Sequence, residues 1–323
     1  MTQPTVDVIC PVFREAEGIQ AFHAELATVL DGLSSRYAFR VVYVLDPSAD
    51  ETQQRLAEIC ALDRRVTVVV LSRRFGHQAS LTAGIAHADG DAVIMLDSDG
   101  QHPPDVIAEL LAAFDRGADV VQAVREHGEQ EGWFKRTTSE GFYKVMSRLA
   151  AIDLRVGSAD FRLLSRRVAD VFRDQLPERN PFIRGLTSWV GFTVAYVGFT
   201  SRPRLAGNSK YSVRLLVEFA INGVTSFSKV PIRAAAVLGT LMSTLSAMYA
   251  FFAVIAYFAQ DFVPPGWTSL LAVVAFIGGL QLFFLGLIAE YVGQIFDEVK
   301  GRPRYIVAEI LGQRVGPGLK GVS

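Results

Sequence analysis

Two long apolar stretches in the last third of the chain constrain its fold more than any other feature. The first runs from Ile232 to Phe258 with Arg233 as its only charged residue, and the second runs from Thr268 to Val292 with Glu290 as its only one. Each stretch reaches the ~20 residues that a helix needs to cross a bilayer. We therefore expect two transmembrane helices. The alternative is a helical hairpin buried in a soluble core, which two stretches of this length without caps disfavour.

The charges that flank the two stretches predict their orientation. Cations precede the first stretch and follow the second, whereas the connector 259–267 carries Asp261, two prolines and Trp267. Because positive charge favours the cytoplasmic side, we expect an integral inner- or plasma-membrane protein with its N-terminal domain and both termini in the cytoplasm. The flanking cations are Lys210, Arg214, Lys229, Arg233, Lys300, Arg302 and Arg304.

The composition excludes some classes of protein. With 323 residues the chain is long enough for about two structural units. Its 32 Lys and Arg against 33 Asp and Glu leave a net charge of −1, which does not indicate a nucleic-acid partner. Two cysteines, Cys10 and Cys60, cannot form a disulfide framework and fit reduced thiols in the cytosol.

Short apolar runs alternate with longer amphipathic runs over the first 124 residues. This pattern predicts an α/β domain with a mostly parallel sheet covered by helices on both faces. In such a sheet the loops after Val12, Leu45, Leu71 and Leu96 line one edge. The expected strands are 6–12, 39–45, 66–71, 92–96 and 120–124, and the expected helices are 17–33, 51–60, 78–87 and 104–116.

An acidic loop, Asp97-Ser98-Asp99-Gly100-Gln101-His102-Pro103-Pro104, directly follows the fourth apolar run. Asp97 and Asp99 lie on the same side of an extended backbone, because side chains repeat every two residues. Together with Gln101 they offer oxygen ligands, which suit Mg²⁺ or Mn²⁺. An acidic turn without a ligand is the alternative. We leave His102 out of the metal set, because a lone histidine beside two prolines is more typical of a structural hydrogen bond.

Several motifs in order give the chain a family resemblance. It resembles the family-2, GT-A-type glycosyltransferases, and within them the polyprenyl-phosphate glycosyltransferases, the group of dolichyl-phosphate mannose synthase and GtrB-like enzymes. The motifs are the acidic loop, Pro11-Val12-Phe13-Arg14-Glu15, Leu71-Ser72-Arg73-Arg74-Phe75-Gly76, Trp133-Phe134-Lys135-Arg136, Asp160-Phe161-Arg162-Leu163, Ala206-Gly207-Asn208-Ser209-Lys210-Tyr211 and the two terminal spans with Ala289-Glu290-Tyr291.

The resemblance implies four segments. They are a Rossmann-like GT-A domain (1–210), a juxtamembrane amphipathic helix (211–230), a transmembrane hairpin (231–292) and a cytosolic juxtamembrane tail (293–323). Helical spacing of apolar residues in 211–230 fits a helix in the headgroup plane or one packed on the domain. A second, shorter helix is expected at 292–300. The resemblance also implies a homo-oligomer, commonly a tetramer.

The resemblance also implies roles for individual residues. Asp160 matches the proposed catalytic base, although it could instead position the acceptor or pair with Arg162 or Arg166. Arg204 and Lys210 flank a glycine-containing loop able to close over a diphosphate. The implied nucleotide-sugar-binding residues are Pro11, Val12, Glu15, Asp46, Ser72, Asp97, Arg204 and Lys210, and the implied acceptor-phosphate residues are Arg125, Lys135, Arg136 and Ser139.

Two positions depart from the family pattern. Leu45-Asp46-Pro47 stands where the family has an Asp-Asp-Gly-like run that holds the nucleoside, so the sequence does not choose between a UDP- and a GDP-sugar. Gly100 replaces a larger apolar residue, which we expect to loosen the metal loop.

The function that follows is inverting transfer of one sugar from a nucleotide-sugar to an undecaprenyl- or dolichyl-type phosphate at the cytoplasmic membrane face. A processive polysaccharide synthase is one alternative, but it would carry a Gln-x-x-Arg-Trp box, and none of Trp133, Trp189 and Trp267 follows an arginine. The other alternative is a non-catalytic membrane scaffold that binds nucleotide-sugars, which the intact acidic residues disfavour.

Overall fold

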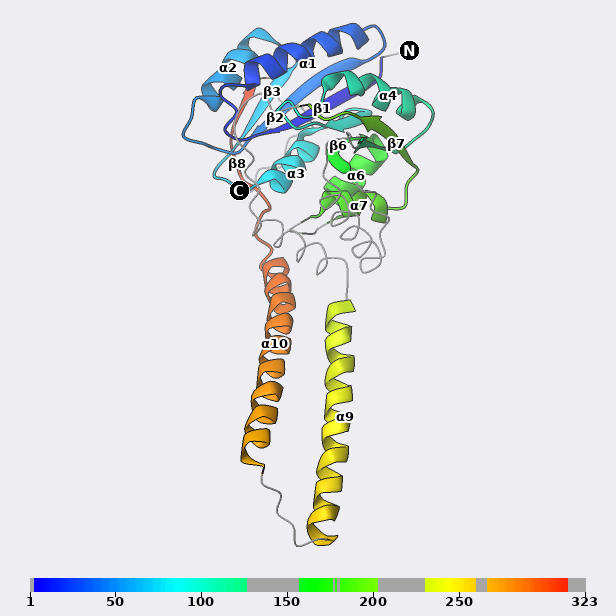
Figure 1. The fold of residues 1–323 in the computed structure, drawn as a ribbon. Helices are drawn as coiled ribbons and strands as arrows, with labels where there is room; N and C mark the ends of the chain where they lie inside the picture. Colours follow the sequence, from blue (N-terminus) through cyan, green and yellow to red (C-terminus); the bar gives the residue numbers. More distant parts are fainter. Residues whose placement is uncertain are drawn as a thin grey trace. The chain divides into compact units, whose positions relative to one another are not determined.

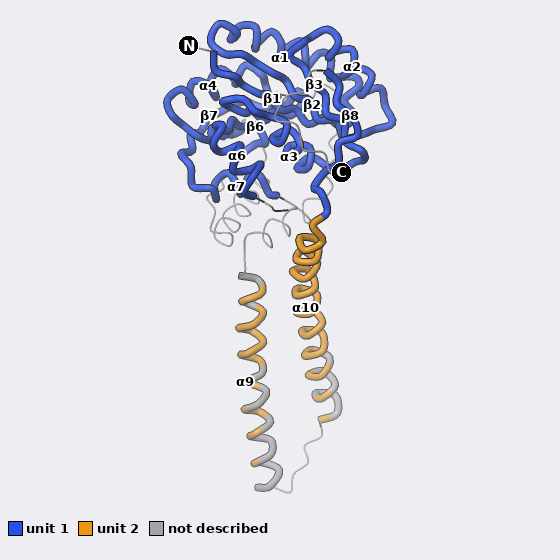
Figure 2. Tube along the Cα trace, turned by 180° about the vertical axis from the view of Figure 1, so that it is seen from behind, with its two compact units in different colours: residues 1–148, 152–216, 302–323 blue, residues 149–151, 217–301 orange. Residues whose placement is uncertain are grey.

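The computed structural model describes residues 3–126, 157–176, 178, 181–202, 230–259 and 266–312. The chain divides into two compact units, drawn in different colours in Figure 2. Unit 1 comprises residues 1–148, 152–216 and 302–323, and unit 2 comprises residues 149–151 and 217–301.

Unit 1 is an α/β domain built on one mixed sheet (Figure 1). Its strands are β1 (Thr5–Val12), β2 (Ala38–Leu45), β3 (Val66–Leu71), β4 (Ala92–Met95), β5 (Val120–Arg125), β6 (Ser158–Ser165), β7 (Val194–Phe199) and β8 (Val307–Gly312). Its helices are α1 (Ile19–Leu33), α2 (Thr52–Leu62), α3 (His77–His87), the 3₁₀ helix η1 (Pro104–Val106), α4 (Ile107–Asp115), α6 (Arg166–Asp174) and α7 (Ile183–Trp189).

The strands are arranged in the order β7-β5-β6-β4-β1-β2-β3-β8. The pairs β1–β2, β1–β4, β2–β3 and β5–β7 are parallel, which confirms that the loops after the first four strands meet at one edge. Strand β6 runs antiparallel between β4 and β5, with Met95 opposite Arg162. The start of β6 therefore lies at the edge where β4 ends.

The elements predicted for residues 6–124 are confirmed to within two residues at nearly every boundary. The expected helix 104–116 is divided, because its first turn is 3₁₀ (η1) and α4 continues from Ile107. The prediction succeeded because each strand is a nearly continuous apolar run, as expected for strands that are buried on both faces.

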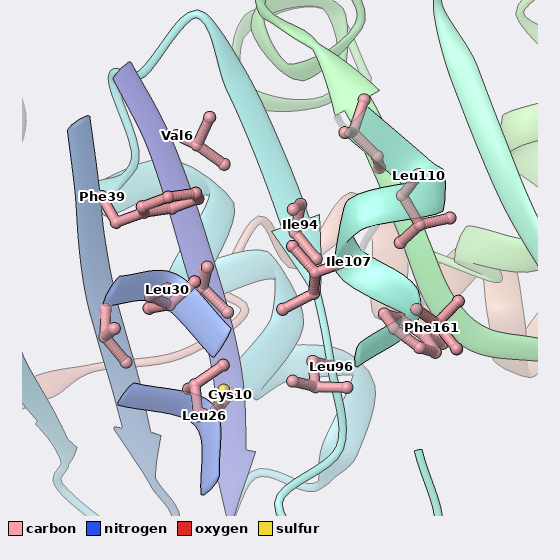
Figure 3. Close-up of a cluster of buried hydrophobic side chains, with 14 of the residues drawn as sticks. Val6, Cys10, Leu26, Leu30, Phe39, Ile94, Leu96, Ile107, Leu110 and Phe161 are labelled. Carbon is pink, nitrogen blue, oxygen red and sulfur yellow. The ribbon is translucent and has the colours of Figure 1, made fainter. Parts of the chain in front are cut away.

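The hydrophobic core lies on one face of the sheet, against α1 and α4 (Figure 3). Leu26 and Leu30 of α1 belong to the same buried cluster as Val6 and Cys10 of β1, and all four are fully buried. Alternate residues of β1 point to the other face, where α3 contacts β1 and β2. This packing fixes the start of α3 at the carboxyl edge of the sheet.

A segment within the predicted cytosolic tail adds an edge strand to the sheet. β8 pairs antiparallel with β3, with Val69 opposite Ile310. Just before β8, the carbonyl oxygen of Ile306 accepts a 2.8 Å hydrogen bond from the N–H of Ser72. This strand was not predicted from the sequence.

Unit 2 contains the helices α9 (Val230–Ala259) and α10 (Trp267–Val299), which cover the two apolar stretches. Among the described residues, one segment is long and apolar enough to cross a membrane, Phe276–Val299 of α10, with a mean hydropathy of 1.6. A transmembrane span in α9, which contains the first apolar stretch, therefore remains a prediction. The short separate helix expected at 292–300 is wrong, since α10 continues without a break through Val299. The helix expected at 211–230 lies outside the described residues.

The close approach of α3 to β1 generates a prediction. A Cβ atom at Gly84 would lie under 3.0 Å from Ile9 Cγ2 and would also press on two other atoms of the same side chain. Because overpacking a core typically costs about 1–3 kcal/mol, Gly84→Ala should lower the free energy of unfolding of unit 1 by that amount. The measurement is the urea midpoint of the detergent-solubilised full-length chain. Gly32→Ala in α1, where nothing lies within 4 Å of the new methyl group, is the matched control and should not destabilise the protein.

Candidate active site

The candidate site lies at the carboxyl edge of the sheet, between β1 and β4. After β1 the chain continues to β2, and after β4 it continues to β5, so the two connections run in opposite directions along the strand order. Ligands of open α/β sheets bind at such a switch point. Ser98, in the loop after β4, donates a 2.9 Å hydrogen bond from its hydroxyl to the carbonyl oxygen of Pro11 in β1. The acidic loop is thereby fixed across the switch point.

Backbone hydrogen bonds shape the acidic loop. The N–H of Asp97 donates to Nδ1 of His102 over 3.2 Å, and the N–H of Gln101 donates to Oδ1 of Asp99 over 3.0 Å. Gly100 has a φ of 79°, in the left-handed region that glycine adopts without strain. Glycine at this position therefore suits the turn that brings Gln101 back toward Asp99.

His102 supports the loop from inside the protein. Its ring stacks on Phe161 with centroids 5.3 Å apart and meets Phe199 edge-on at 5.6 Å. Burial lowers the pKa of His102. The neutral ring then accepts the Asp97 N–H at Nδ1.

Asp97 carries an unsatisfied oxygen. Its Oδ1 atom is buried and has no hydrogen-bond partner in the structure. A buried carboxylate oxygen without a partner is costly, and a hard cation would satisfy it. The described residues contain no group of three or more His, Cys, Asp or Glu side chains that could hold a metal. That Asp97, Asp99 and Gln101 together hold a divalent ion remains a prediction from the sequence.

Asp160, at the start of β6, is almost fully buried in a cluster of cations. Arg184 of α7 donates from Nε and Nη2 to its two carboxylate oxygens over 2.9 and 2.8 Å. Arg162 of β6 donates from Nη2 to Oδ1 over 2.8 Å. Burial alone would raise the pKa of Asp160, but Arg184, His77 and Arg162 together hold it well below its ordinary value. The carboxylate therefore stays ionised and is a weak proton acceptor.

His77, the first residue of α3, lies between Asp160 and Asp97. Its Nε2 atom is 3.4 Å from Oδ2 of Asp160 and 3.6 Å from Oδ1 of Asp97. Burial alone would lower the pKa of His77, but the two carboxylates raise it to about 9. Neither His77 nor Arg184 was predicted as a site residue from the sequence. The position of His77, directly after Gly76 and before a predicted helix, could have indicated that it lies at the edge of the sheet. No feature of the sequence around Arg184 indicates a site residue.

The carboxylate of Asp46, which follows β2, accepts hydrogen bonds from the backbone of a neighbouring loop. Its Oδ1 accepts the N–H of Phe75 over 2.9 Å, and its Oδ2 accepts the N–H of Gly76 over 2.8 Å. Asp46 is only 3% exposed. The carboxylate thus fixes the turn that leads into α3 and positions His77.

The other predicted site residues are distributed along the same edge. Val12 accepts the N–H of Asp46 at its carbonyl oxygen, Glu15 donates its N–H to the hydroxyl of Thr52, and Ser72 is exposed after β3. Arg125 ends β5, where its N–H donates to the carbonyl oxygen of Gly157. The remaining predicted residues lie outside the described part of the chain: Lys135, Arg136, Ser139, Arg204 and Lys210.

The fold is the GT-A fold of glycosyltransferases. A mannosyltransferase from Pyrobaculum calidifontis, solved in complex with GDP-Man and Mn²⁺, superposes with a TM-score of 0.50 at 16% sequence identity. The match covers 94% of this chain and 89% of that structure. At this identity the similarity establishes the fold alone.

The chain belongs to glycosyltransferase family 2. The model of that family, described as Glycosyl transferase family 2, matches residues 7–172. A glycosyltransferase of Synechocystis sp. is 38% identical over 307 residues, which cover 95% of this chain and 96% of the relative. A bactoprenol glucosyl transferase derived from a prophage of Shigella flexneri is 35% identical over 302 residues, which cover 94% of this chain and 97% of the relative.

The hydrogen bonds of Asp46 generate a second prediction. In Asp46→Asn the side chain has one acceptor oxygen, so one of the two half-buried N–H groups of the 75–76 turn loses its partner. This should lower the free energy of unfolding by about 1–3 kcal/mol, measured as the shift of the urea midpoint. Asp50→Asn is the matched control, because Asp50 is exposed and the hydroxyls of Ser48 and Thr52 donate to its carboxylate. An equal loss of unfolding free energy in both variants would contradict the role of Asp46 in holding the 75–76 turn.

Proposed function

We propose that the chain transfers a single sugar from a UDP- or GDP-sugar to a polyprenyl phosphate at the cytoplasmic membrane face, with inversion at the anomeric carbon. The observation that carries the proposal is the unsatisfied, buried Oδ1 of Asp97 at the switch point of a family-2 fold, 3.6 Å from His77 and at the edge that holds Asp160. The acceptor class is supported by the relative named bactoprenol glucosyl transferase, which aligns over nearly its whole length.

Asp97, Asp99 and Gln101 are the residues we propose to hold Mg²⁺ or Mn²⁺. The similar fold of the Pyrobaculum enzyme was solved with Mn²⁺, which supports a divalent ion in this site. When bound there, the ion supplies Lewis-acid neutralisation of the departing diphosphate. The hydrogen bonds from Ser98 and His102 keep the loop in place for this role.

Asp160 positions the acceptor in this proposal and does not act as a strong base. Two guanidiniums bind its carboxylate, so it has little tendency to take up a proton near neutral pH. A phosphate monoester with a second pKa of about 6 is already largely ionised there. The acceptor oxygen can thus attack the sugar without losing a proton to the protein.

Cations at the edge of the site would bind the acceptor phosphate. Arg125 at the end of β5 is the described member of this set, and Lys135, Arg136 and Ser139 complete it by family resemblance. Arg204 and Lys210 are proposed to close over the donor diphosphate. Helices α9 and α10 would form the transmembrane hairpin, with both termini cytoplasmic, and the family resemblance favours a tetramer.

The proposed reaction predicts a lipid-linked product. Membranes containing the full-length chain, given labelled UDP-glucose, UDP-galactose, UDP-N-acetylglucosamine or GDP-mannose with Mn²⁺ and undecaprenyl phosphate, should yield an organic-extractable monoglycosyl lipid from one donor. NMR of that product should show the anomeric configuration opposite to that of the donor. Asp97→Asn and Asp99→Asn should each reduce transfer at least ~100-fold, because charge stabilisation at the reacting group is lost.

Glu109→Gln is the matched control for these variants, because Glu109 is exposed on α4 and makes the same change from carboxylate to amide. A water-insoluble polymer would identify a processive synthase. No transfer from any donor would leave only a nucleotide-sugar-binding scaffold.

The metal assignment has its own test. Removal of divalent ions with EDTA should abolish transfer, and MnCl₂ or MgCl₂ should restore it. Isothermal titration of the ion-free protein with MnCl₂ and UDP or GDP should show binding that weakens at least ~10-fold in Asp99→Asn. Undiminished Mn²⁺ binding in that variant would refute the assignment.

A further inference from the structure

Arg184 makes a two-point contact with the carboxylate of Asp160. Its Nε and Nη2 atoms donate to Oδ1 and Oδ2 respectively, over 2.9 and 2.8 Å. Such parallel bonds fix the plane of a carboxylate as well as neutralising its charge. Arg162 donates to Oδ1 alone. Because the terminal torsion of an aspartate is broad, Arg162 by itself would leave the position of Oδ2 free to vary.

The helix that carries Arg184 is itself firmly held. Ile183 and Leu186, three residues apart, are both buried. The N–H of Ile183 donates to Oε1 of Gln78 in α3 over 3.4 Å, and Thr187 Oγ1 lies 3.4 Å from Nη1 of Arg162 in β6. α7 is therefore connected to both elements that carry the site.

Oδ2 of Asp160, which Arg184 orients, also faces His77. Nε2 of His77 lies 3.4 Å from this oxygen and 3.6 Å from Oδ1 of Asp97. Arg184, Asp160, His77 and Asp97 thus form a continuous row of alternating basic and acidic side chains. The row leads from α7 to the proposed metal loop.

We propose that Arg184 is a positioning residue of the transfer reaction, which fixes the orientation of Asp160 and, through it, of His77 beside Asp97. The inference rests on the proposed function, because it gives the Asp160 carboxylate a role in the reaction. It makes α7 a part of the catalytic framework in addition to the loops after the first four strands.

A purely structural role is the competing explanation, and the geometry allows the two to be separated. The side chain of Arg184 is 25% exposed, and the packing of α7 relies on Ile183 and Leu186. Asp160 keeps Arg162 and His77 as partners when Arg184 is replaced. We therefore expect the variants to fold.

Arg184→Gln should reduce kcat of the full-length enzyme by ~10- to 100-fold, as expected for a reacting group displaced by about 1 Å. The KM for the nucleotide-sugar should change less than threefold. Arg184→Lys should recover part of kcat, because lysine restores the charge without the two-point geometry. Arg36→Gln, which removes an exposed arginine that is paired with Asp115, is the matched control and should leave kcat unchanged.

A double variant separates action through Asp160 from an independent effect. If Arg184 acts through Asp160, then Arg184→Gln combined with Asp160→Asn should have the kcat of Asp160→Asn alone. Multiplied losses in the double variant, or an unchanged kcat in Arg184→Gln, would overturn the proposal.

A spectroscopic measurement tests the inference without turnover. The chain has five histidines, and the His77 ring resonance can be assigned in histidine-labelled protein by its loss in His77→Asn. Arg184→Gln and Asp160→Asn should both shift this resonance, whereas Arg36→Gln should not. An unshifted His77 signal in Arg184→Gln would refute the positioning role. Absence of glycosyl lipid from the wild type would refute only the proposed function.

Discussion

A buried carboxylate requires compensating charge, and the way Asp160 obtains it organises this site. Because desolvation penalises an unpaired charge, the guanidiniums of Arg162 and Arg184 must reach the same point from β6 and α7. His77 approaches from α3 on the side of Asp97. β6, α7 and α3 thereby bring their side chains to one edge of the sheet, the edge at which the acidic loop leaves β4.

The part of the fold that could be predicted is the part encoded locally. Strands buried on both faces are apolar runs, and the amphipathic segments between them pack as helices, so residues 6–124 were correctly assigned from their pattern. The same apolar pattern predicted that Asp97 and Asp99 follow the end of a strand. The resemblance of the chain to family-2 glycosyltransferases was confirmed by the family match over residues 7–172.

The rest depended on contacts between distant residues. The sequence of Val307–Gly312 does not predict that this segment pairs with β3. The sequence around Arg184 does not predict its ion pair with Asp160. Asp46 shows a different limit, because its residue type suggested a ligand contact while the structure commits both of its oxygens to the 75–76 turn. A sequence pattern identifies which groups a site can use, but the pairing between them is set by tertiary packing.

The edge strand β8 has a consequence for biosynthesis. It follows α10 in the chain, yet it completes the sheet beside β3, so the sheet cannot close until the ribosome has finished both long apolar helices. Until then the outer edge of β3 presents unpaired backbone groups, which promote aggregation. Maturation of the α/β fold is thus coupled to the synthesis of α9 and α10, and a nascent chain arrested before residue 307 would retain an incomplete sheet.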